Sequence, residues 1–271
     1  MTYLFDPVNW EWLWSGNNLR FLLEGFAVNL QIAAVAMVLS LAFGLMLALL
    51  RISKVRLISV PTGIWVDVFR NLPVIFLILY LFLGLPESWT NAYADAVPGF
   101  FSEALQSGFV LAGILALVLY NSAVLAEIMR SGILSLERGQ SDAAYALGLT
   151  YFQAMRRVIL PQGLRRMVPA TVSQLITLNK DTTLVSIIAI QEVVRHGRIL
   201  STSGVFFGEV QAPVLQVFIV IGLMFIAVNL VLSRLSRRLE IRERKRTAIK
   251  AGRVTGVEDQ VAAETDLVTP R

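Results

Sequence analysis

Several charged and polar side chains of this sequence lie inside long apolar runs, and these residues are the clearest candidates for a functional role. An ionisable group at the centre of a bilayer costs about 2.5–3.5 kcal/mol on insertion scales, so it requires a partner, an aqueous cavity or a function. Each such group would contact either another helix or a polar solute. The candidates for a polar passage or a gate are Arg70, Asn71, Glu127, Arg130, Lys180, Asp181, Thr182, Thr183 and Ser186.

Two roles remain open for Lys180, Asp181 and Arg70. Lys180 and Asp181 are adjacent near the centre of an apolar run, and adjacent helical residues point about 100° apart, so the pair need not neutralise itself. For Lys180, Asp181 and Arg70, contact with a solute and structural salt bridges between helices are both consistent with the sequence. Asp67 shares this ambiguity.

A local pair is favoured for Glu127 and Arg130. They are three residues apart, which places them on one helix face. The spacing therefore predicts a structural or gating ion pair. Asn29 is a further polar residue in an apolar run, and a hydrogen bond between helices is its expected use.

The apolar runs themselves predict membrane spans. Hydrophobic residues make up 56% of the 271 residues, and the mean hydropathy is +0.66. A helix needs about 20 mostly apolar residues to cross a bilayer. Phe26–Leu50, Ala104–Ala126 and Ala212–Ser233 contain no charged residue, while Leu57–Leu85 and Met167–Ile190 contain a few. The prediction is an all-α polytopic membrane protein with five transmembrane helices, since nothing alternates as barrel strands do.

The basic residues indicate orientation. They gather after the first span, between the third and fourth spans, and after the fifth, whereas Pro86–Glu103 has no Lys or Arg. The positive-inside rule then predicts an external N-terminus and a cytoplasmic C-terminus. The domains expected are an external segment (1–20) with an interfacial anchor at Trp10, Trp12 and Trp14, a transmembrane domain (21–240), and a cytoplasmic tail (241–271) that is basic and then disordered from about Gly252.

Other classes of function have little support. The basic residues flank spans, so the net charge of +5 reports topology and gives no indication of nucleic-acid binding. The chain has no cysteine and one histidine, His196, which is expected in a solvated external loop, so no metal site is predicted. The N-terminus lacks a signal-peptide pattern, and the first span is expected to be retained.

A polar, basic segment between the third and fourth spans indicates a docking element. Ser141 is a suitable N-cap, and Gly148 is a natural stop for a short alanine-rich helix. Thr150 and Gln153 have the spacing of a capping box that begins a second helix, and Pro161 is expected to end that helix. The two helices would form an elbow with a face small enough to enter a groove on a soluble partner. An ordinary amphipathic loop helix is the alternative.

This segment resembles the EAA loop of ABC-importer permeases. Asp142-Ala143-Ala144, Gly148 and the run Val158-Ile159-Leu160-Pro161 follow the pattern E-A-A-x3-G-x9-I-x-L-P, with Asp for Glu at 142 and Val for Ile at 158. The stretches FRNLPVIFLILYLF, AEIMRSGILSLERGQSDAAYALGL and LNKDTTLVSIIAIQEV are similar to polar amino-acid uptake permeases. The resemblance covers roughly Gly25 to Ser236.

The resemblance implies a permease subunit in the cytoplasmic membrane of a prokaryote. Its partners would be a second permease, identical or homologous, two cytoplasmic ABC ATPases, an external solute-binding protein and membrane lipid. The segment 137–161 would dock on the ATPase. The chain has no G-x-x-x-x-G-K-[ST] motif, so ATP and Mg would bind to the ATPases and no cofactor to this chain. The expected coupling residues are Asp142, Ala143, Ala144, Gly148, Val158, Leu160 and Pro161.

The candidate passage residues would then meet a polar L-amino acid, with glutamate or aspartate as the first guess. Lys180 and Arg70 favour an acidic substrate, whereas Asp67, Asp181 and Glu127 favour a basic one. The rival functions are a secondary transporter or channel, an intramembrane enzyme, and a structural subunit that pairs with a transporting homologue. The enzyme lacks a plausible set of catalytic residues, and a gradient-driven carrier leaves the elbow unexplained.

Overall fold

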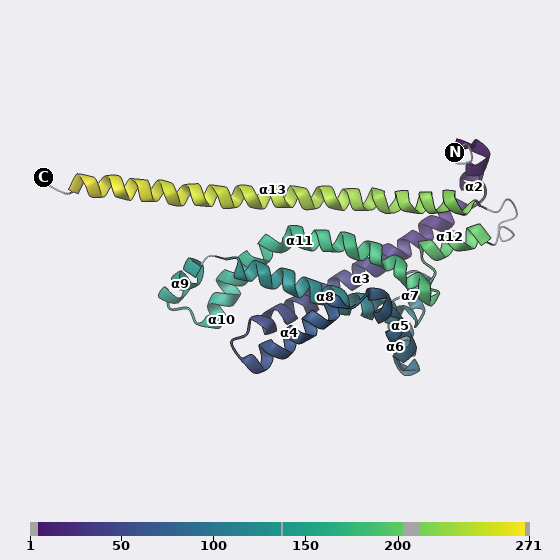
Figure 1. Cartoon of the computed structure of the whole chain (residues 1–271), viewed down its shortest axis with the longest axis horizontal. Coiled ribbons are helices and arrows are strands. Elements are labelled where there is room, and N and C mark those ends of the chain that lie inside the picture. The colour runs from purple at the N-terminus through teal and green to yellow at the C-terminus, as the bar shows by residue number, and fades with distance from the viewer. Residues whose placement is uncertain (1–4, 137, 203–211, 269–271) are drawn as a thin grey trace.

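The computed structural model describes residues 5–136, 138–202 and 212–268, and all regular elements in this part are helices (Figure 1). Side chains are described up to Arg242, except that of Arg138. Glu137 of the expected docking segment and the ends of the expected terminal segments therefore lie outside the described residues. In chain order the elements are η1 (Pro7–Trp10), α2 (Glu11–Trp14), α3 (Asn18–Ile52), α4 (Arg56–Asn71), α5 (Val74–Gly84), α6 (Glu87–Ala96), α7 (Glu103–Gln106), α8 (Val110–Leu134), α9 (Arg138–Ala146), α10 (Tyr151–Ala154), η2 (Met155–Ile159), α11 (Leu160–Asp181), η3 (Thr182–Ile188), α12 (Val193–Thr202) and α13 (Val214–Val268).

The long helices α3 and α8 pack along each other and form the core. Gly44 of α3 permits the close approach, because a Cβ at this position would lie 2.9 Å from the Cβ of Leu125 and 3.1 Å from the carbonyl oxygen of Ser122. Gly25, Gly113 and Gly132 also lie against side chains of other elements, as membrane packing favours. Gly222 differs, since nothing lies within 4 Å of a Cβ built there.

The expected second span is broken. Helix α4 ends at Asn71, α5 begins at Val74, and their axes are bent by 102°. Pro73 provides the physical reason, because it lacks an N–H and disfavours helical backbone at the preceding residue. Leu72 accordingly has extended backbone, with φ −81° and ψ 135°. The expectation of one continuous helix over Leu57–Leu85 is therefore wrong.

The helix of the expected fourth span also ends before its apolar run, Met167–Ile190, ends. Helix α11 ends at Asp181, a 3-10 helix η3 continues to Ile188, and Ala189 has a left-handed backbone with φ +61°. Lys180 and Asp181 consequently lie at a helix end, whereas the sequence predicts them near the centre of a span. Within the described residues, α3, α8 and Val214–Arg242 of α13 are long and apolar enough to cross a membrane, and α4–α5 adds a fourth candidate if the bent pair is one span.

Helix α11 packs between α8 and α13 although it is polar. Its amide side chains bond to both neighbours, with Gln174 Nε2 2.8 Å from Asn121 Oδ1 and Asn179 Nδ2 3.1 Å from Asn229 Oδ1. Hydrogen bonds of this kind join helices where water is absent. The low hydropathy of α11 therefore reflects polar contacts with other helices.

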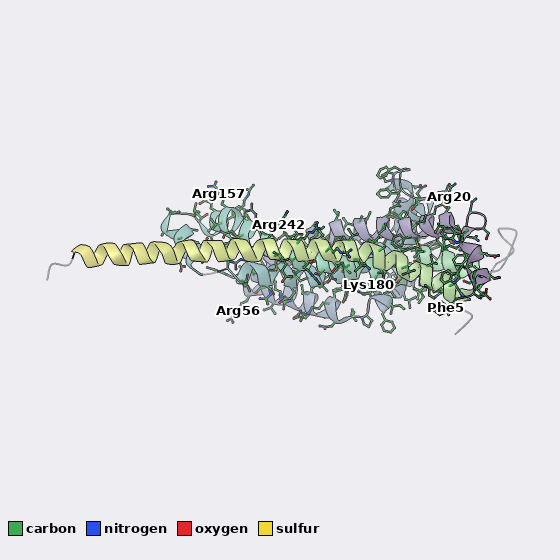
Figure 2. The ribbon with its side chains drawn as sticks, turned by 90° about the horizontal axis from the view of Figure 1, so that it is seen from above. Phe5, Arg20, Arg56, Arg157, Lys180 and Arg242 are labelled. Carbon is green, nitrogen blue, oxygen red and sulfur yellow. The ribbon has the colours of Figure 1, made fainter. Side chains whose placement is uncertain are left out.

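A second apolar cluster lies at the end of the molecule opposite α9 and α10, where α2, α12 and the start of α13 meet α3. Trp12 is 2% exposed within this cluster, so it is a core residue, while Trp14 is 77% exposed. Figure 2 places Phe5 and Arg20 at this end and Arg157 toward the other, with Lys180 between them. We call the end that carries α9 and α10 the elbow end.

His196 is buried in α12, contrary to the expected solvated loop. Its ring stacks on that of Phe21 at a centroid distance of 3.8 Å, and its Nδ1 lies 2.6 Å from the Phe21 carbonyl oxygen. The apolar side of α12 packs against α3 and α13, and His196 is buried because it is on this side of the helix. Gly25 makes room for the ring, since a Cβ there would be 2.6 Å from Nδ1 of His196.

The last helix continues far beyond its apolar part. Helix α13 runs to Val268 and extends past α9 at the elbow end (Figure 1). The expected disorder from Gly252 onward is therefore not what the structure shows. Residues 241–268 contain no proline and are rich in Ala, Glu, Lys and Arg, which have high helix propensity, and two glycines cost only about 1 kcal/mol each.

Candidate functional site

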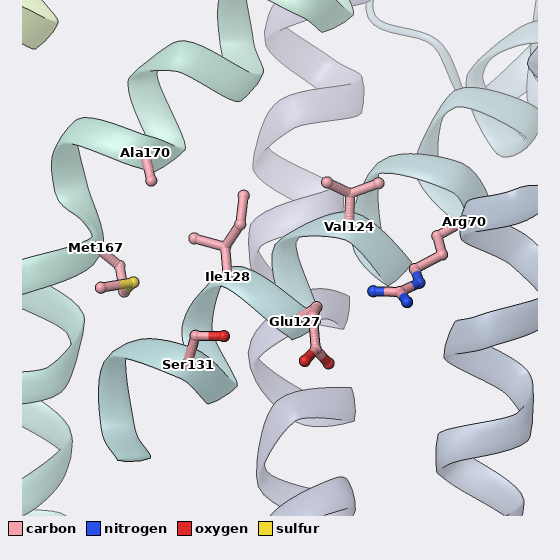
Figure 3. A pocket seen from close by; sticks show the side chains of 7 residues that line it. All are labelled: Arg70, Val124, Glu127, Ile128, Ser131, Met167 and Ala170. Atoms are coloured by element: carbon pink, nitrogen blue, oxygen red, sulfur yellow. The ribbon is translucent and has the colours of Figure 1, made fainter. Parts of the chain in front are cut away.

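A cavity of about 390 Å³ lies between α4, α8 and α11 (Figure 3). This volume is within the range of small-molecule sites, roughly 300–1,000 Å³. The wall is largely apolar, with one cation and one carboxylate. The lining residues are Arg70, Val124, Glu127, Ile128, Ser131, Met167 and Ala170.

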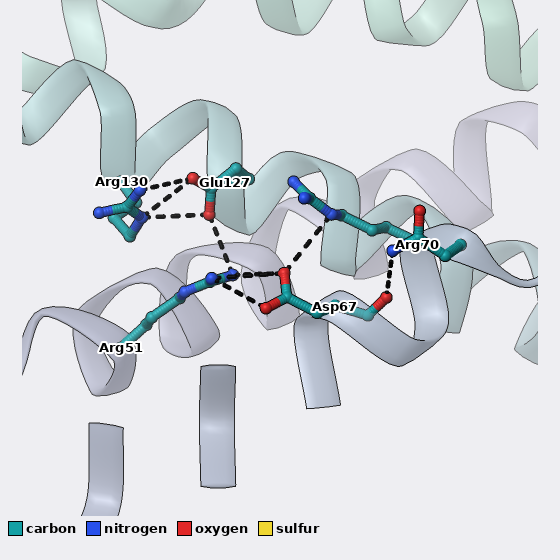
Figure 4. Close-up of polar contacts among 6 residues, drawn as sticks. Arg51, Asp67, Arg70, Glu127 and Arg130 are labelled. Atoms are coloured by element: carbon teal, nitrogen blue, oxygen red, sulfur yellow. Dashed lines mark hydrogen bonds and ion pairs between the residues drawn. The ribbon is translucent and has the colours of Figure 1, made fainter. Parts of the chain in front are cut away.

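The two charged lining residues belong to a network of ion pairs that joins α3, α4 and α8 (Figure 4). Glu127 is 2.6 Å from Arg130 Nη2 and 3.0 Å from Arg51 Nη1. Arg51 Nη2 also lies 3.2 Å from Asp67 Oδ2, and Arg70 Nε lies 3.5 Å from Asp67 Oδ1. Three guanidinium groups therefore face two carboxylates, which leaves the network with a surplus positive charge.

Local sequence explains how these side chains come together. Arg51 is in the last turn of α3, and Arg70 is in the last turn of α4, one turn after Asp67. Asn71 Nδ2 donates to the Asp67 carbonyl oxygen at 2.6 Å, one turn back on the same helix. Pro73 stops α4 directly after this group, so Arg70 faces the cavity from a helix terminus.

The expected pair of Glu127 and Arg130 is confirmed, since Arg130 contacts both carboxylate oxygens from the same face of α8. Asp67, whose role the sequence left open, is in the same network. The sequence indicates Arg51 only as a topology signal, because a basic residue directly after the apolar run Phe26–Leu50 is typical of a cytoplasmic span end. Ser131 and Met167 were also missed, because a cavity wall has no local sequence pattern.

The expected passage residues between Lys180 and Ser186 do not line this cavity. Lys180 is exposed and Asp181 half-buried, and neither makes an ion pair with another residue that the structure describes. Thr183 Oγ1 bonds to the Lys180 carbonyl oxygen at 2.8 Å, so its hydroxyl is used locally. Ser186 lies in η3, half-buried. The sequence thus grouped residues that the fold places at two different levels of the bundle.

Thr182 belongs to a buried polar cluster that the sequence indicated only in part. Asn29 Nδ2 donates to Thr182 Oγ1 at 3.0 Å and to Glu192 Oε2 at 3.1 Å, and Asn29 Oδ1 accepts from the Val193 N–H at 3.0 Å. The expected hydrogen bond between elements by Asn29 is therefore confirmed. Glu192 was missed, although its place directly before α12 is a helix-capping position.

Glu192 caps α12 from a fully buried position. Its carboxylate accepts from the N–H groups of Val194 at 3.0 Å and Arg195 at 2.8 Å. Burial raises the pKa of the Glu192 carboxyl, and the hydrogen bonds from Val194, Asn29 and Arg195 oppose that rise. The cluster connects α3, η3 and α12, which is a structural role.

The elbow has the geometry that its sequence predicts at two points. Gly148 has φ +77°, a conformation that suits glycine at a helix stop. Thr150 Oγ1 accepts from the Gln153 N–H at 3.4 Å, and Gln153 Oε1 accepts from the Thr150 N–H at 3.0 Å, so the capping box is confirmed.

Two other expectations for the elbow are wrong. Helix α9 begins at Arg138, so Ser141 is inside the helix and does not cap it. Pro161 lies in the first turn of α11, and the chain stays helical from Tyr151 to Asp181. A π-helical turn, η2, precedes the proline, and the Leu160 N–H bonds to the Met155 carbonyl oxygen five residues back. This local change of period accommodates the residue that cannot donate.

The surface of the elbow combines exposed apolar side chains with the expected coupling residues. Asp142, Ala143, Gly148 and Pro161 are exposed, Ala144 is buried, and Val158 and Leu160 are half-buried. Four large side chains stand out from the same segment. These are Tyr145, Leu147, Tyr151 and Phe152, which are 42%, 82%, 43% and 69% exposed.

Comparisons with known proteins identify the family. Residues 40–245 match the family of binding-protein-dependent transport system inner membrane components. The chain is 38% identical over 233 residues to the probable glutamine ABC transporter permease protein GlnP of Bacillus subtilis, covering 85% of this chain and 97% of that protein. It is 32% identical over 236 residues to the glutamate/aspartate import permease protein GltK of Escherichia coli O157:H7, covering 84% and 99%.

Solved structures agree with this assignment. The crystal structure of an amino acid ABC transporter with histidines superimposes with a TM-score of 0.67 at 26% identity, covering 85% of this chain and 98% of that one. The MetNI methionine ABC transporter, in an inward-facing conformation, shares the fold with a TM-score of 0.56 at 19% identity. The chain therefore belongs to the binding-protein-dependent inner membrane components, as a multi-pass bacterial permease of the polar amino-acid ABC transporter family that is not itself an ATPase.

Proposed function

We propose that this permease binds a polar L-amino acid in the cavity between α4, α8 and α11 during ATP-driven import. The observation that carries the proposal is the presence of two opposite charges, Arg70 and Glu127, on the largely apolar wall of one cavity. A guanidinium group presents paired donors to a carboxylate. Arg70 would receive the α-carboxylate, and Glu127 supplies the opposite charge on the same wall.

The elbow supports docking on two cytoplasmic ATPases, which would bind the ATP and Mg. Its exposed Leu147 and Phe152 offer apolar contact area for a groove, and Gly148 permits the sharp turn between α9 and α10. Closure of the ATPases would then move the spans as a rigid body and switch the cavity between two states. A second permease, identical or homologous, and an external solute-binding protein complete the proposed complex.

The proposed topology has five spans, with the N-terminus outside and the C-terminus in the cytoplasm. The four apolar candidates are α3, the bent pair α4–α5, α8 and α13. Helix α11 would be the remaining span, because it packs between α8 and α13 and satisfies its polar groups there. This arrangement puts the elbow and the basic residues after α3 on the cytoplasmic side.

Glutamate or aspartate is the substrate that we propose. The surplus positive charge of the ion-pair network favours a solute with a surplus carboxylate. Glutamine is a second candidate, because the relative that is 38% identical is described as a probable glutamine permease.

Import by the reconstituted complex tests these proposals. Proteoliposomes that hold the permease, its ATPase and its binding protein are loaded with ATP, and uptake of radiolabelled glutamate is measured against competing glutamine and arginine. Glutamate is expected to be concentrated only with ATP and the ATPase present. Vesicles that hold this chain alone and still concentrate solute would support a gradient-driven carrier and contradict the proposal.

Docking is tested separately by co-purification of the ATPase with wild-type permease and with Gly148→Asp. A side chain at φ +77° strains the turn, and a charge at this exposed point would oppose an apolar contact. Loss of the complex is expected, whereas normal import by Gly148→Asp would contradict the docking assignment.

A further inference from the structure

The cation and the carboxylate that line the cavity do not neutralise each other. Among the residues that the structure describes, no ion pair joins Arg70 to Glu127, although both border the same space (Figures 3 and 4). Opposite charges across a small, largely apolar cavity attract strongly. Other groups must therefore hold them apart.

Two arginines hold the carboxylate of Glu127, since Arg130 contacts both oxygens from the same helix and Arg51 reaches it from α3. Nη1 of Arg51 lies 3.0 Å from Glu127 Oε2, and its Nη2 lies 3.2 Å from Asp67 Oδ2, so one guanidinium spans carboxylates on two different helices. The side chains of Arg51 and Glu127 are only 19% and 22% exposed, which limits screening by water. Arg51 thus links α4 and α8 to the end of α3.

Asp67 contacts Nε of Arg70, and this leaves the two terminal nitrogens of the Arg70 guanidinium available. The contact at 3.5 Å is made by Nε of Arg70, and no described residue makes a hydrogen bond or ion pair to Nη1 or Nη2. Figure 3 shows the guanidinium end of Arg70 directed toward the space beside Val124 and Glu127. Two parallel donors remain for a carboxylate.

We propose that Arg51 and Asp67 are positioning residues that keep Arg70 open as the carboxylate-binding group of the cavity. Arg51, together with Arg130, keeps Glu127 occupied, and Asp67 anchors Nε of Arg70. Without Arg51, Glu127 keeps only Arg130 as a partner, and without Asp67 the Nε of Arg70 is released. Either change lets Arg70 turn toward Glu127, so that its guanidinium no longer faces the substrate. The inference rests on the proposed function, since it assigns supporting roles around the same cavity.

The test measures ATP-dependent uptake of radiolabelled glutamate, with glutamine in a parallel arm, by proteoliposomes of the complete transporter. Asp67→Asn and Arg51→Gln are each expected to lower the uptake rate about three- to tenfold, the size of coupling between adjacent charges. Arg56→Gln is the matched control, because Arg56 is exposed at the start of α4 and makes no ion pair with a described residue. Its uptake is expected to equal that of the wild type.

The double variant R51Q/E127Q separates positioning from plain stabilisation. Glu127 also lines the proposed site, so E127Q is expected to lower uptake by itself. Because Arg70 then has no carboxylate to capture, adding R51Q to E127Q is expected to cause no further loss. A purely structural role would make the losses of R51Q and E127Q multiply, and that result would overturn the inference. The amount of ATPase that co-purifies is measured for each variant, so that uptake is expressed per assembled complex.

Arg51→Lys provides a milder variant if Arg51→Gln assembles poorly. Lysine keeps the charge but lacks the fork that reaches two carboxylates, so uptake between those of the wild type and Arg51→Gln is expected. Wild-type uptake by Arg51→Lys would overturn the role of the fork. Arg70→Gln tests the proposed site itself, since normal uptake by this variant contradicts binding of the carboxylate by Arg70. Impaired Arg70→Gln with normal Asp67→Asn and Arg51→Gln contradicts only the positioning roles.

Discussion

At the scale of the residue, His196 shows how one buried side chain can join distant parts of the chain. Its ring stacks on Phe21 of α3, and its Nδ1 contacts the Phe21 carbonyl oxygen at 2.6 Å. Burial lowers the pKa of His196 from its ordinary value of 6.5, while the Phe21 carbonyl and Glu24 oppose this change. The folded protein therefore favours the neutral ring, and protonation opposes the contact between α12 and α3.

The lowered pKa of His196 predicts that the thermal stability of the permease falls as the pH is lowered. Because the folded-state pKa is lowered, the contribution of His196 is complete above pH 6.5 and is lost as the pH falls toward the lowered value. Thermal unfolding of the purified permease is measured from pH 7.5 to 5 for the wild type and for His196→Phe, whose ring cannot titrate. The wild type is expected to lose melting temperature relative to the variant on acidification. A constant difference would contradict the prediction.

At the scale of the element, contact between α3 and α8 depends on small residues. A Cβ at Gly44 would meet the Leu125 Cβ at 2.9 Å and the backbone of Ser122 and Ala126 at 3.1 and 3.3 Å. These atoms belong to a helix and cannot turn aside. Gly44→Ala is therefore expected to lower the free energy of unfolding by about 1–3 kcal/mol, the usual cost of overpacking.

Gly222→Ala makes the same chemical change in α13 and serves as the control. Nothing lies within 4 Å of its added Cβ, so the variant is expected to keep or slightly raise the melting temperature of the isolated chain. Equal losses in Gly44→Ala and Gly222→Ala would show that the close packing of α3 on α8 is not the cause.

The elbow also contacts the connection between α3 and α4. The Lys54 ammonium lies over the Tyr151 ring at 5.2 Å from its centroid, three residues after Arg51 of the ion-pair network. A cation–π contact at an exposed site contributes about 0.5–1 kcal/mol. Lys54→Met is therefore expected to lower substrate-stimulated ATPase activity roughly two- to fivefold. Lys54→Arg keeps the cation and should retain the activity, and a loss equal to that of Lys54→Met would contradict a cation–π role.

The elements show which features a sequence can predict. The Gly148 stop and the Thr150–Gln153 capping box depend on residues close in sequence, and both are confirmed. The pair of Glu127 and Arg130 is equally local. Pro161 was misjudged because a π-helical turn accommodates it, and this change of period has no composition signal.

The contacts that build the site depend on tertiary structure. The cavity appears only when α4, α8 and α11 pack together, so Ser131 and Met167 could not be recognised from their neighbours. Lys180 and Asp181 were grouped with Arg70 because all three are charges in apolar runs. The early end of α11 at Asp181 places them elsewhere. Hydropathy identifies the apolar runs, but it does not locate the breaks within them.

At the scale of the whole molecule, the chain has a core that relatives share and a C-terminal part beyond it. The family match ends at residue 245, and the match to GltK covers 99% of that protein but only 84% of this chain. Helix α13 nevertheless continues to Val268 past the elbow (Figure 1). Tolerance of truncation depends on the contacts that the removed backbone makes.

Two truncations of α13 test this division. A chain of residues 1–245 is expected to co-purify with the ATPase and to import within roughly twofold of the full chain, because it keeps the basic residues next to the apolar span. A chain of residues 1–233 loses those residues, each worth about 1 kcal/mol near anionic lipid. It also loses Ser236, whose hydroxyl donates to the Pro169 carbonyl oxygen at 3.0 Å and ties α13 to α11. Poor recovery of the 1–233 chain from membranes is expected, and the same loss for 1–245 would show that the distal helix belongs to the functional core.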